Sequence, residues 1–563
     1  MNKLLLPLLI LIPNVVFGQL TGNVSDENTG EPLAFATVSF ESLSRGTITN
    51  EDGFFKLSCS QTLPDTLRVS FIGYQPLRLP IAQRDSVTMD IKLKPSTVEI
   101  PLVVINGSDG TAPNREMKIF KKWQETKGNW GTKMYMTLTS EEERTPVEVV
   151  EACFNGKFYG NNLLDLSLKG GRLGVHTDPK YRFVNLNTTD VLLKFSLKPE
   201  SSPPIPHPAV QKKKQWKSNY YWDLLAQYTE NGDTLRRWKL VPDFPQLASC
   251  EVVFNLNDET VLSYSIRTNS TLPTLLKPVV EEDEIASLNL RMEWRFDEYD
   301  QRLQVWNFEY EMGYRNASRK RDIHVEGFAH AYDKESLFPE AMYSGQKMQT
   351  DYEKLLVWSF DPEFWAAQEI VPASKKAEEH RAFFERHGHL TNVAQLGEVE
   401  FPIFRCIPGQ LNWNHFKGEN GWSSNLDKGD IKRMSNSSRY ALSCEWFINP
   451  YYDGDTCKIQ RAVVFDGRNS FYQLENDSLA LVFVNTYAAL VELEQAGLIA
   501  DLQQRSIACE TKLFKPIWSD ARARSKMRIN RFLREVDRGE NEDAFRRWQL
   551  FIREEQKNFG LID

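Results

Sequence analysis

The sequence has few of the residues that most catalytic and metal centres use. It holds 8 histidines and 7 cysteines among 563 residues. No two cysteines are spaced Cys-x-x-Cys, so neither a zinc ribbon nor a thioredoxin motif is present. There is no His-Glu-x-x-His, no Gly-x-Ser-x-Gly and no glycine-rich phosphate loop. These absences argue against the commonest hydrolase and nucleotide-binding classes, and we predict no catalytic residue, cofactor or metal.

An excess of positive charge and a long apolar segment are also missing. The net charge is −8, which argues against general binding to nucleic acid or to anionic membranes. After residue 18 no run approaches the ~18 consecutive apolar residues of a membrane-spanning helix, so we predict no transmembrane segment.

Residues 1–18 have the features of a signal peptide. Lys3 precedes an apolar stretch that is too short to span a bilayer, and Val16 and Gly18 occupy the −3 and −1 positions of a cleavage site. No cysteine follows the cleavage point for a lipid anchor. We therefore expect export, cleavage near Gly18/Gln19, and a periplasmic or outer-membrane-associated protein.

Residues 19–105 predict a small β-sandwich. Phe55 and Leu57 alternate with polar residues, and so do the apolar residues of 67–71 and 87–93, which is the period of a half-buried strand. Asn50-Glu-Asp-Gly53 is typical of a hairpin turn because these residue types tolerate positive φ. Short strands separated by frequent turns are typical of a sandwich.

The same segment resembles the carboxypeptidase-regulatory-like (transthyretin-like) domain of bacterial envelope proteins. The matching motifs are Thr29-Gly-Glu-Pro-Leu33, Gly46-Thr-Ile-Thr-Asn-Glu-Asp-Gly-Phe54 and Ile72-Gly-Tyr74, in that order. Residues 99–105 look like the family's terminal strand. The resemblance implies an accessory sandwich without peptidase activity, in a protein outside the cytoplasm.

Residues 132–345 predict one large curved antiparallel sheet. Apolar residues alternate with polar ones over 288–296 and 303–308, on either side of a turn at Asp297-Glu-Tyr-Asp300. Two further hairpins are expected at 221–241 and 250–266. The Pro203–Pro208 stretch and Lys212–Lys214, which precede these two hairpins, are interpreted as an exposed loop, with a basic binding patch as the alternative.

This middle region also resembles the part that follows the sandwich in outer-membrane relatives. The matching pieces include Gly170-Gly-Arg-Leu-Gly174 and Phe360-Asp-Pro-Glu-Phe-Trp365. The resemblance implies a half-barrel whose concave face either holds an acyl chain or a peptide or is a closed core, and the sequence favours the closed core. The ~170 residues after 390 lack the alternating ten-residue strands of those relatives' membrane barrel.

Two clusters could form binding sites, and one pair of cysteines could form a disulfide. His380, His387 and His389, near Glu385, could bind Zn²⁺, but a helix ending explains them equally, since basic groups complement the dipole at a helix carboxyl end. Trp413, Trp422 and Trp446 lie near Asn412, Asn414 and His415 and could stack on a sugar, although packing is the simpler use. Cys444 and Cys457 could pair across a hairpin, or the cysteines are buried and unpaired.

The carboxyl-terminal region predicts strands near 401–407, 440–448 and 458–465, followed by helices. Residues 479–502 form an apolar helix, and 519–559 are helical and charged. In this charged segment Met527, Phe532, Phe545, Trp548 and Phe551 form an apolar stripe that is expected to pack on its own domain.

The sequence thus predicts a mainly β protein with α elements, made of an amino-terminal β-sandwich, a half-barrel-like sheet and an α+β domain ending in helices. The expected function is non-enzymatic, a binding or scaffold role in the cell envelope with a lipid, peptide or protein partner and no nucleic acid. The alternative is an exported hydrolase, active in its last domain and directed at glycan. The predicted segments are a signal peptide (1–18), the sandwich (19–105), a linker with a helix near 115–127 (106–131), the curved sheet with a terminal helix (132–390) and the α+β domain (391–563).

Overall fold

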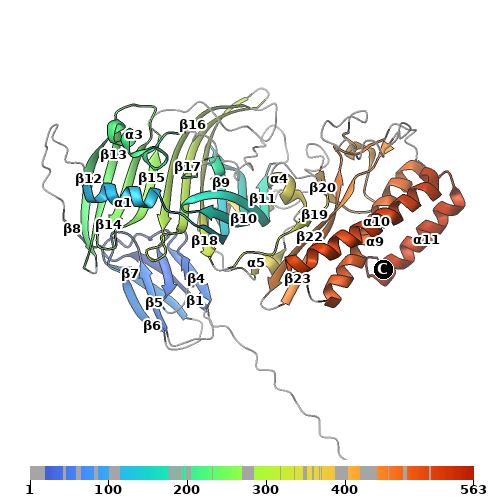
Figure 1. The fold of residues 1–563 in the computed structure, drawn as a ribbon, viewed down its shortest axis with the longest axis horizontal. Coiled ribbons are helices and arrows are strands. Elements are labelled where there is room, and N and C mark those ends of the chain that lie inside the picture. The colour runs from blue at the N-terminus through green and yellow to red at the C-terminus, as the bar shows by residue number, and fades with distance from the viewer. Residues whose placement is uncertain are drawn as a thin grey trace, which may run out of the picture. The chain divides into compact units, whose positions relative to one another are not determined.

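The structure is a computed structural model (Figure 1). It describes residues 19–562 apart from a set of short segments, and the expected signal peptide lies outside the described residues. The segments not described are 42–45, 59–64, 82–86, 100–113, 177–182, 184–191, 195, 198–204, 231, 269–283, 317–318, 335, 346–350, 358–360, 367, 369–370, 387–402, 419–439, 454–455, 473–477, 506 and 508.

The chain divides into two compact units. The first comprises Met1–Ile100, Gln227–Leu235 and Glu369–Lys375, and the second comprises Pro101–Ala226, Arg236–Gln368 and Lys376–Asp563. Mainly β structure with carboxyl-terminal helices confirms the predicted fold class.

The first unit is the predicted sandwich, built from a sheet of order β4-β1-β7 and a sheet of order β3-β2-β5-β6. Its core consists of inward-facing apolar residues such as Val24, Phe55 and Val69. The predicted turn is confirmed, since Asn50 Oδ1 accepts from Asp52 N and Phe54 N, and Gly53 has φ +75°. The strands are β1 (Gln19–Asp26), β2 (Thr37–Phe40), β3 (Gly46–Ile48), β4 (Phe54–Ser58), β5 (Asp65–Ser70), β6 (Leu77–Ile81) and β7 (Val87–Leu93).

Strand β8 (Thr97–Glu99) overlaps the predicted terminal strand, 99–105, only at Glu99. It pairs with Gln227–Thr229 of the large sheet. These three residues also belong to the first unit. The rest of the predicted terminal strand, 100–105, lies outside the described residues.

The predicted curved sheet is confirmed as an antiparallel sheet of order β11-β10-β9-β18-β17-β16-β15-β14-β13-β12-β8 (Figure 1). All three hairpins expected from the sequence are present. The strands are β9 (Asn129–Glu142), β10 (Thr145–Tyr159), β11 (Asn162–Val175), β12 (Tyr220–Glu230), β13 (Asp233–Pro242), β14 (Ser249–Asn255), β15 (Thr260–Arg267), β16 (Glu284–Phe296), β17 (Leu303–Asn316) and β18 (Arg319–Asp333).

The two faces of this sheet differ. Along β16, Leu288, Leu290, Met292, Trp294 and Phe296 are buried and alternate with more exposed polar residues. The buried residues join the largest core cluster, which also includes residues of α1 (Asn114–Gln124) and α3 (Lys213–Asn219). Helix α1, which ends three residues before the predicted end, packs against β15.

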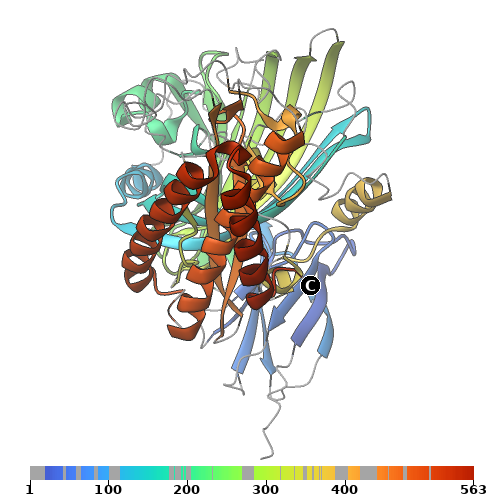
Figure 2. The ribbon, with the colours of Figure 1, turned by 90° about the vertical axis from the view of Figure 1, so that its right-hand side faces the viewer.

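The carboxyl-terminal part of the second unit is a sheet of order β19-β22-β23-β20 with three helices. Helix α9 contacts β22 and β23 and also contacts α10 and α11, and Figures 1 and 2 show the three helices side by side. The elements are β19 (Met342–Tyr343), β20 (Ile403–Cys406), β22 (Cys444–Asp453), β23 (Thr456–Asp466), α9 (Ser478–Arg505), α10 (Thr511–Val536) and α11 (Glu542–Asn558).

Helix α9 has the length and apolar composition of a membrane span, but 56% of its most apolar window is buried in the structure. It supplies core residues such as Phe483, Leu490 and Leu502 between the sheet and the other two helices. Burial on several sides explains a helix that is apolar all round.

Several smaller elements complete the described chain. They are the short strands β21 (Tyr440–Ala441) and β24 (Phe471–Tyr472), the helices α4 (Asp351–Val357), α5 (Pro362–Ala366) and α6 (Lys375–Arg386), and the 3-10 turns η1 (Pro208–Val210), η2 (Trp413–His415) and η3 (Asp537–Gly539).

Of the two alternatives for the cysteines, the Cys444–Cys457 pair is not formed. Cys457 forms a disulfide with Cys509, with Cα atoms 5.9 Å apart. In the β22–β23 register Cys444 lies opposite Phe465 and Cys457 opposite Tyr452, so the hairpin keeps the two cysteines apart. Among the described residues Cys153, Cys250, Cys406 and Cys444 are buried free thiols.

Two surface predictions also need correction. The proline-rich loop is not wholly exposed, since His207, Pro208 and Ala209 are buried and lysines 213 and 214 begin helix α3. In the expected apolar stripe, Phe532, Phe545 and Trp548 are buried, but Met527 and Phe551 are exposed because they lie on the outer side of the helix pair.

Candidate functional site

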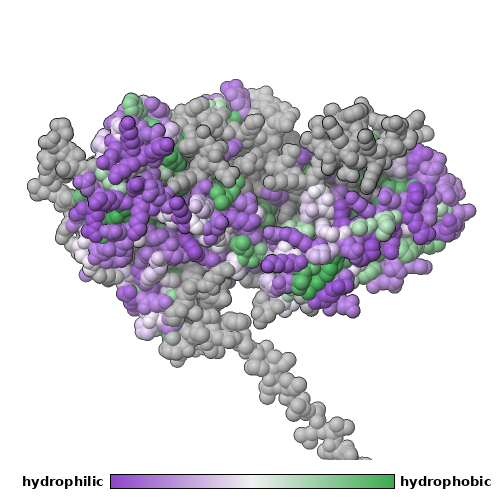
Figure 3. All heavy atoms as spheres, viewed as in Figure 1, coloured by the Kyte–Doolittle hydropathy of each residue, from purple (hydrophilic) through white to green (hydrophobic). Residues whose placement is uncertain are grey.

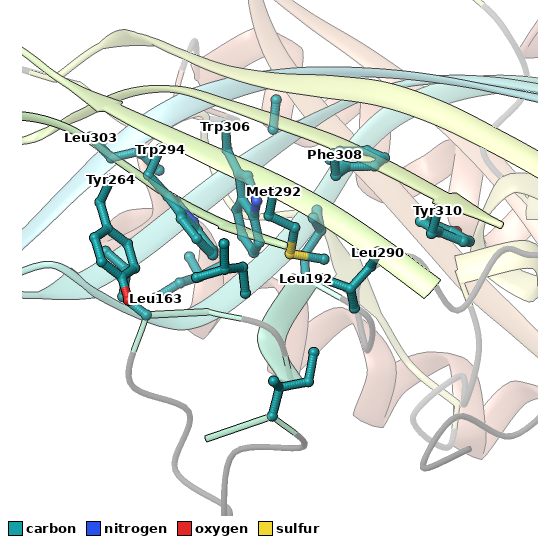
Figure 4. Close-up of a cluster of buried hydrophobic side chains, with 14 of the residues drawn as sticks. Leu163, Leu192, Tyr264, Leu290, Met292, Trp294, Leu303, Trp306, Phe308 and Tyr310 are labelled. Atoms are coloured by element: carbon teal, nitrogen blue, oxygen red, sulfur yellow. The ribbon is translucent and has the colours of Figure 1, made fainter. Parts of the chain in front are cut away.

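The strongest candidate site is an aromatic cluster on the face of the curved sheet that α1 packs against. We call it the aromatic face. It contains large side chains from seven elements. Figure 4 labels three of these side chains, Tyr264, Trp294 and Trp306, together with aliphatic neighbours. Its members are Phe120, Trp123, Trp216, Trp222, Trp238, Tyr264, Trp294, Phe296 and Trp306.

Strand register places the centre of the aromatic face. Tyr264 of β15 lies opposite Trp294 of β16, and Trp294 lies opposite Trp306 of β17. The ring centroids are 5.9 Å apart for the first pair and 5.4 Å for the second. Neighbours across antiparallel strands point to the same side, so three large rings form a continuous row.

Helix α1 supplies rings to the same cluster. The ring centroids of Trp123 and Tyr264 are 5.5 Å apart, and those of Phe120 and Trp216 are 5.7 Å apart. Phe120 and Trp123 are three residues apart, which puts them on one side of the helix.

Polar contacts fasten α1 at both ends. Near the amino end, Arg236 Nη1 donates to Glu116 Oε1 at 2.8 Å, and Arg115 donates to the carbonyl of Leu256. At the carboxyl end Gln124 Nε2 donates to the carbonyls of Pro208 and Ala209 at 2.7 and 3.0 Å. The helix is thus held by polar groups at its two ends and by Met117, Ile119, Phe120 and Trp123, which are buried beneath it.

The polar groups at the centre are neutral near pH 7. The imidazole Nδ1 of His207 and the hydroxyl of Tyr264 are 2.8 Å apart. Burial lowers the pKa of His207 to about 3 and raises the pKa of Tyr264. Because neither group gains or loses a proton near pH 7, this pair is unsuited to acid–base catalysis there.

Several indole N–H groups of the aromatic face have no hydrogen-bond partner within the described part of the chain, although their nitrogen atoms are buried. Three of these tryptophans, Trp123, Trp216 and Trp306, are themselves at least nine-tenths buried. Buried donors normally have a partner. The face therefore combines apolar side chains with buried donors that have no acceptor among the described residues. The tryptophans are Trp123, Trp216, Trp222, Trp238 and Trp306.

A second cluster consists of ion pairs between α6 and the neighbouring strands. Glu151, nearly fully buried, accepts from Tyr135, from Arg381 at 2.6 Å and from Arg172. A carboxylate held by two guanidinium groups is already satisfied. We interpret this cluster as the attachment of α6 to the sheet.

Of the three histidines that could bind Zn²⁺, only His380 lies within the described residues. His380 is buried, and its Nε2 lies 2.9 Å from Glu141. Burial, outweighing the attraction of Glu141, lowers the pKa of His380. His387 and His389 lie outside the described residues. Among the residues that are described, no group of three or more His, Cys, Asp or Glu is placed to hold a metal ion.

The two described tryptophans that could stack on a sugar, Trp413 and Trp446, both pack within the protein, which was the simpler expectation. The indole of Trp446 is buried in the core and donates to the carbonyl of Val491 at 3.0 Å. Trp413 packs against Tyr472, with ring centroids 4.9 Å apart. Asn412 caps the turn at Asn414, and Trp422 lies outside the described residues.

The sequence did not predict the aromatic face as a binding site. The strand alternation predicted that Trp294 and Phe296 lie on one buried face, but it did not include Trp306. The contacts of Trp123 with Tyr264 and Phe296 depend on packing between segments far apart in the chain, which spacing alone does not reveal. The signal available was an α1 sequence with Phe120 and Trp123 on one side and charges elsewhere.

Comparison with known proteins identifies the first segment. Residues 20–105 match the family model of the CarboxypepD_reg-like domain. This segment is a CarboxypepD_reg-like domain. The TonB-dependent receptor SusC of Bacteroides thetaiotaomicron is 43% identical over 81 residues, which cover 14% of this chain and 8% of the receptor. The likeness is thus limited to the region of the CarboxypepD_reg-like domain, and the chain spans less than a tenth of that relative.

Solved structures resemble the chain only remotely. A LolA superfamily protein from Nitrosomonas europaea is 9% identical, covering 39% of this chain and 94% of its own, with a TM-score of 0.14. A protein from Bacteroides fragilis, described as membrane-associated and of unknown function, is 10% identical, covering 56% of this chain and 97% of its own, with a TM-score of 0.12. TM-scores this low carry no argument about the chain.

Proposed function

We propose that this chain is an exported, non-enzymatic protein of the cell envelope that binds an acyl lipid at the aromatic face. The observation that carries the proposal is the group of buried indole N–H donors without a partner in the described residues. A buried donor left unpaired costs about 1–3 kcal/mol. Several in one cluster favour a ligand with acceptor oxygens, such as the ester or amide carbonyls of an acyl lipid.

The surroundings of these donors fit the rest of such a ligand. Leu163, Leu290 and Met292 lie beside the aromatic row (Figure 4) and offer apolar contact to a hydrocarbon chain. The face is covered when α1 is in place. Because α1 covers the face, we infer that it moves aside to admit the ligand and that the polar contacts at its two ends then break.

The cell-envelope location rests on other observations. The CarboxypepD_reg-like domain is shared with SusC, which is a TonB-dependent receptor. The Cys457–Cys509 disulfide is consistent with an oxidising compartment. Both support a periplasmic or outer-membrane-associated protein.

The test is binding of a fluorescent fatty acid, cis-parinaric acid, to delipidated mature protein, followed by energy transfer from tryptophan. We expect saturable binding near one molecule per chain. Trp306→Phe keeps an aromatic ring and removes one donor, so it should weaken binding by about two- to tenfold, the equivalent of one lost hydrogen bond.

The matched control is Trp446→Phe, which makes the same change in the carboxyl-terminal core where the indole already donates to Val491. Its affinity for the probe should equal that of the wild type. Absence of saturable binding, or an equal loss in both variants, would refute the lipid-binding proposal.

A further inference from the structure

The helices α1 and α3 carry many cations and almost no acidic residues. Helix α1 has four lysines and arginines and a single carboxylate, Glu116, which is buried and bound to Arg236. Helix α3 has three lysines and no acidic residue, and a fourth lysine, Lys212, directly precedes it. The protein as a whole has a net charge of −8. A local excess of one sign marks a surface suited to a partner of the opposite charge.

Helical spacing places the cations of α1 on its solvent side. Phe120 and Trp123 are buried and point to the sheet, whereas Lys118 and Lys122 are exposed. These two lysines are one turn apart and therefore neighbours on the helix surface, on the side opposite the two buried rings. Helix α1 is thus apolar toward the aromatic face and cationic toward the solvent.

Helix α3 continues the same surface. Its buried Trp216 contacts Phe120 of α1, with ring centroids 5.7 Å apart, while Lys214 and Lys217, three residues apart, are exposed. Figures 1 and 2 show α1 and α3 near each other on the same side of the large sheet. We call the exposed sides of these two helices, with Lys212, the lysine surface.

Little of the charge on the lysine surface is neutralised within the molecule. At one end of α1, Arg115 Nη2 lies 3.9 Å from Glu259 Oε1, and at the other end Lys121 Nζ lies 3.5 Å from Glu125 Oε1. The remaining lysines form no ion pair in the described part of the chain. Those that are exposed are Lys118, Lys122, Lys212, Lys214 and Lys217.

The lysine surface has no exposed apolar anchor. No large apolar side chain of α1 or α3 is exposed, and Figure 3 shows a mostly hydrophilic surface where Figure 1 places these helices. The centres of protein interfaces are rich in aromatic residues and arginine and poor in lysine. Lysines without apolar neighbours therefore favour attraction to a charged lipid surface over an interface with another protein.

We propose that the lysine surface docks on a membrane that contains anionic phospholipid. The ammonium groups reach the lipid phosphates while both helices stay packed on the sheet, so the attachment is electrostatic and reversible. Docking places α1, the helix that covers the aromatic face, against the lipid. The proposal rests on charges outside the aromatic face and does not depend on lipid binding there.

The experiment measures sedimentation of the full mature protein with vesicles of phosphatidylcholine, with and without phosphatidylglycerol. We expect binding only to vesicles with phosphatidylglycerol, and less of it at high salt, because salt screens the attraction. Lys118→Glu with Lys122→Glu should weaken binding by more than about tenfold, since each cation near an anionic surface contributes to the attraction. Lys214→Glu with Lys217→Glu should weaken it similarly, and this second variant leaves α1 unchanged.

The control is Lys512→Glu with Lys526→Glu, the same charge change on exposed lysines of α10, which should bind as the wild type does. Circular dichroism and the melting temperature establish that each variant is folded. The proposal is overturned by equal binding to both kinds of vesicle, by no binding at low salt, or by folded lysine-surface variants that bind like the control. Binding to soluble polyglutamate but not to vesicles would also overturn it, in favour of an acidic protein partner.

Discussion

At the scale of single residues, two buried histidines make stability depend on pH. Burial lowers the pKa of His207 to about 3 and that of His330 to about 4, below the usual value of 6.5. Between pH 7 and pH 5 the unfolded chain takes up protons at these positions and the folded chain does not. The unfolded state is therefore favoured as the pH falls.

For each of these histidines the free energy of unfolding should fall by about 2 kcal/mol between pH 7 and pH 5. His207→Gln should remove the part of this fall in unfolding free energy that comes from His207. Urea unfolding at both pH values, followed by tryptophan fluorescence, measures it. His324→Gln is the control, because His324 lies beside Glu311 near the surface. The same pH dependence in His207→Gln and wild type would contradict the assignment of a neutral, buried His207.

At the scale of elements, α1 depends on the contact between Glu116 and Arg236. Glu116 is almost fully buried, whereas Arg236 is partly exposed. Glu116→Gln removes the charge with little change of shape, so α1 should open more often and its amides should exchange hydrogen about tenfold faster, which corresponds to about 1.4 kcal/mol.

Hydrogen exchange followed by mass spectrometry measures this change over residues 114–124. The control is Lys121→Gln, which breaks only the exposed pair with Glu125, a contact of about 0.2–0.5 kcal/mol. If Glu116→Gln leaves exchange in α1 as slow as in the control, the ion pair does not hold the helix.

The disulfide fastens the segment before α10 to the β22–β23 hairpin. Cys457 and Cys509 are 52 residues apart in sequence, and removing a native disulfide generally costs about 2–5 kcal/mol. Cys457→Ser with Cys509→Ser should lower the melting temperature. A thiol reductant should lower the wild-type value to match and leave the variant unchanged. Insensitivity of the wild type to the reductant would show that the bond is absent.

Hairpins were predictable from the sequence because alternation and turn residues are local signals. The pair at 288–308 became β16 and β17, and Asp297 caps the turn as expected. The charged segment 519–559 was harder, since its apolar positions fit one long helix. The structure divides it at Asp537 and Arg538, which both have positive φ. Their side chains give no turn signal comparable to glycine.

At the scale of the whole molecule, long-range pairing limited what the sequence could predict. The sandwich unit includes residues 369–375 from far along the chain, where Asn50 Nδ2 donates to the carbonyl of Ala373 at 3.0 Å and Asp52 accepts from Lys375 N. Such contacts carry no period or motif. The predicted domain boundaries at 131 and 390 stay predictions, and β19, at 342–343, pairs with β22 in the carboxyl-terminal sheet.

The same limit applied to the candidate site. Of its strand residues, Trp294 and Phe296 were predicted to lie on a buried face, and both are buried. The donors without partners became visible only once α1, α3 and the sheet were placed together. A buried polar group is defined by what surrounds it, and sequence spacing does not specify those neighbours.

Native mass spectrometry of the mature protein, purified from the periplasm without detergent, tests lipid binding at the aromatic face most directly. We expect an added mass close to that of one acyl lipid per chain, and organic extraction should remove it. Less lipid should be bound to Trp306→Phe than to Trp446→Phe. A bare polypeptide mass for the wild type, unchanged after extraction, would contradict it.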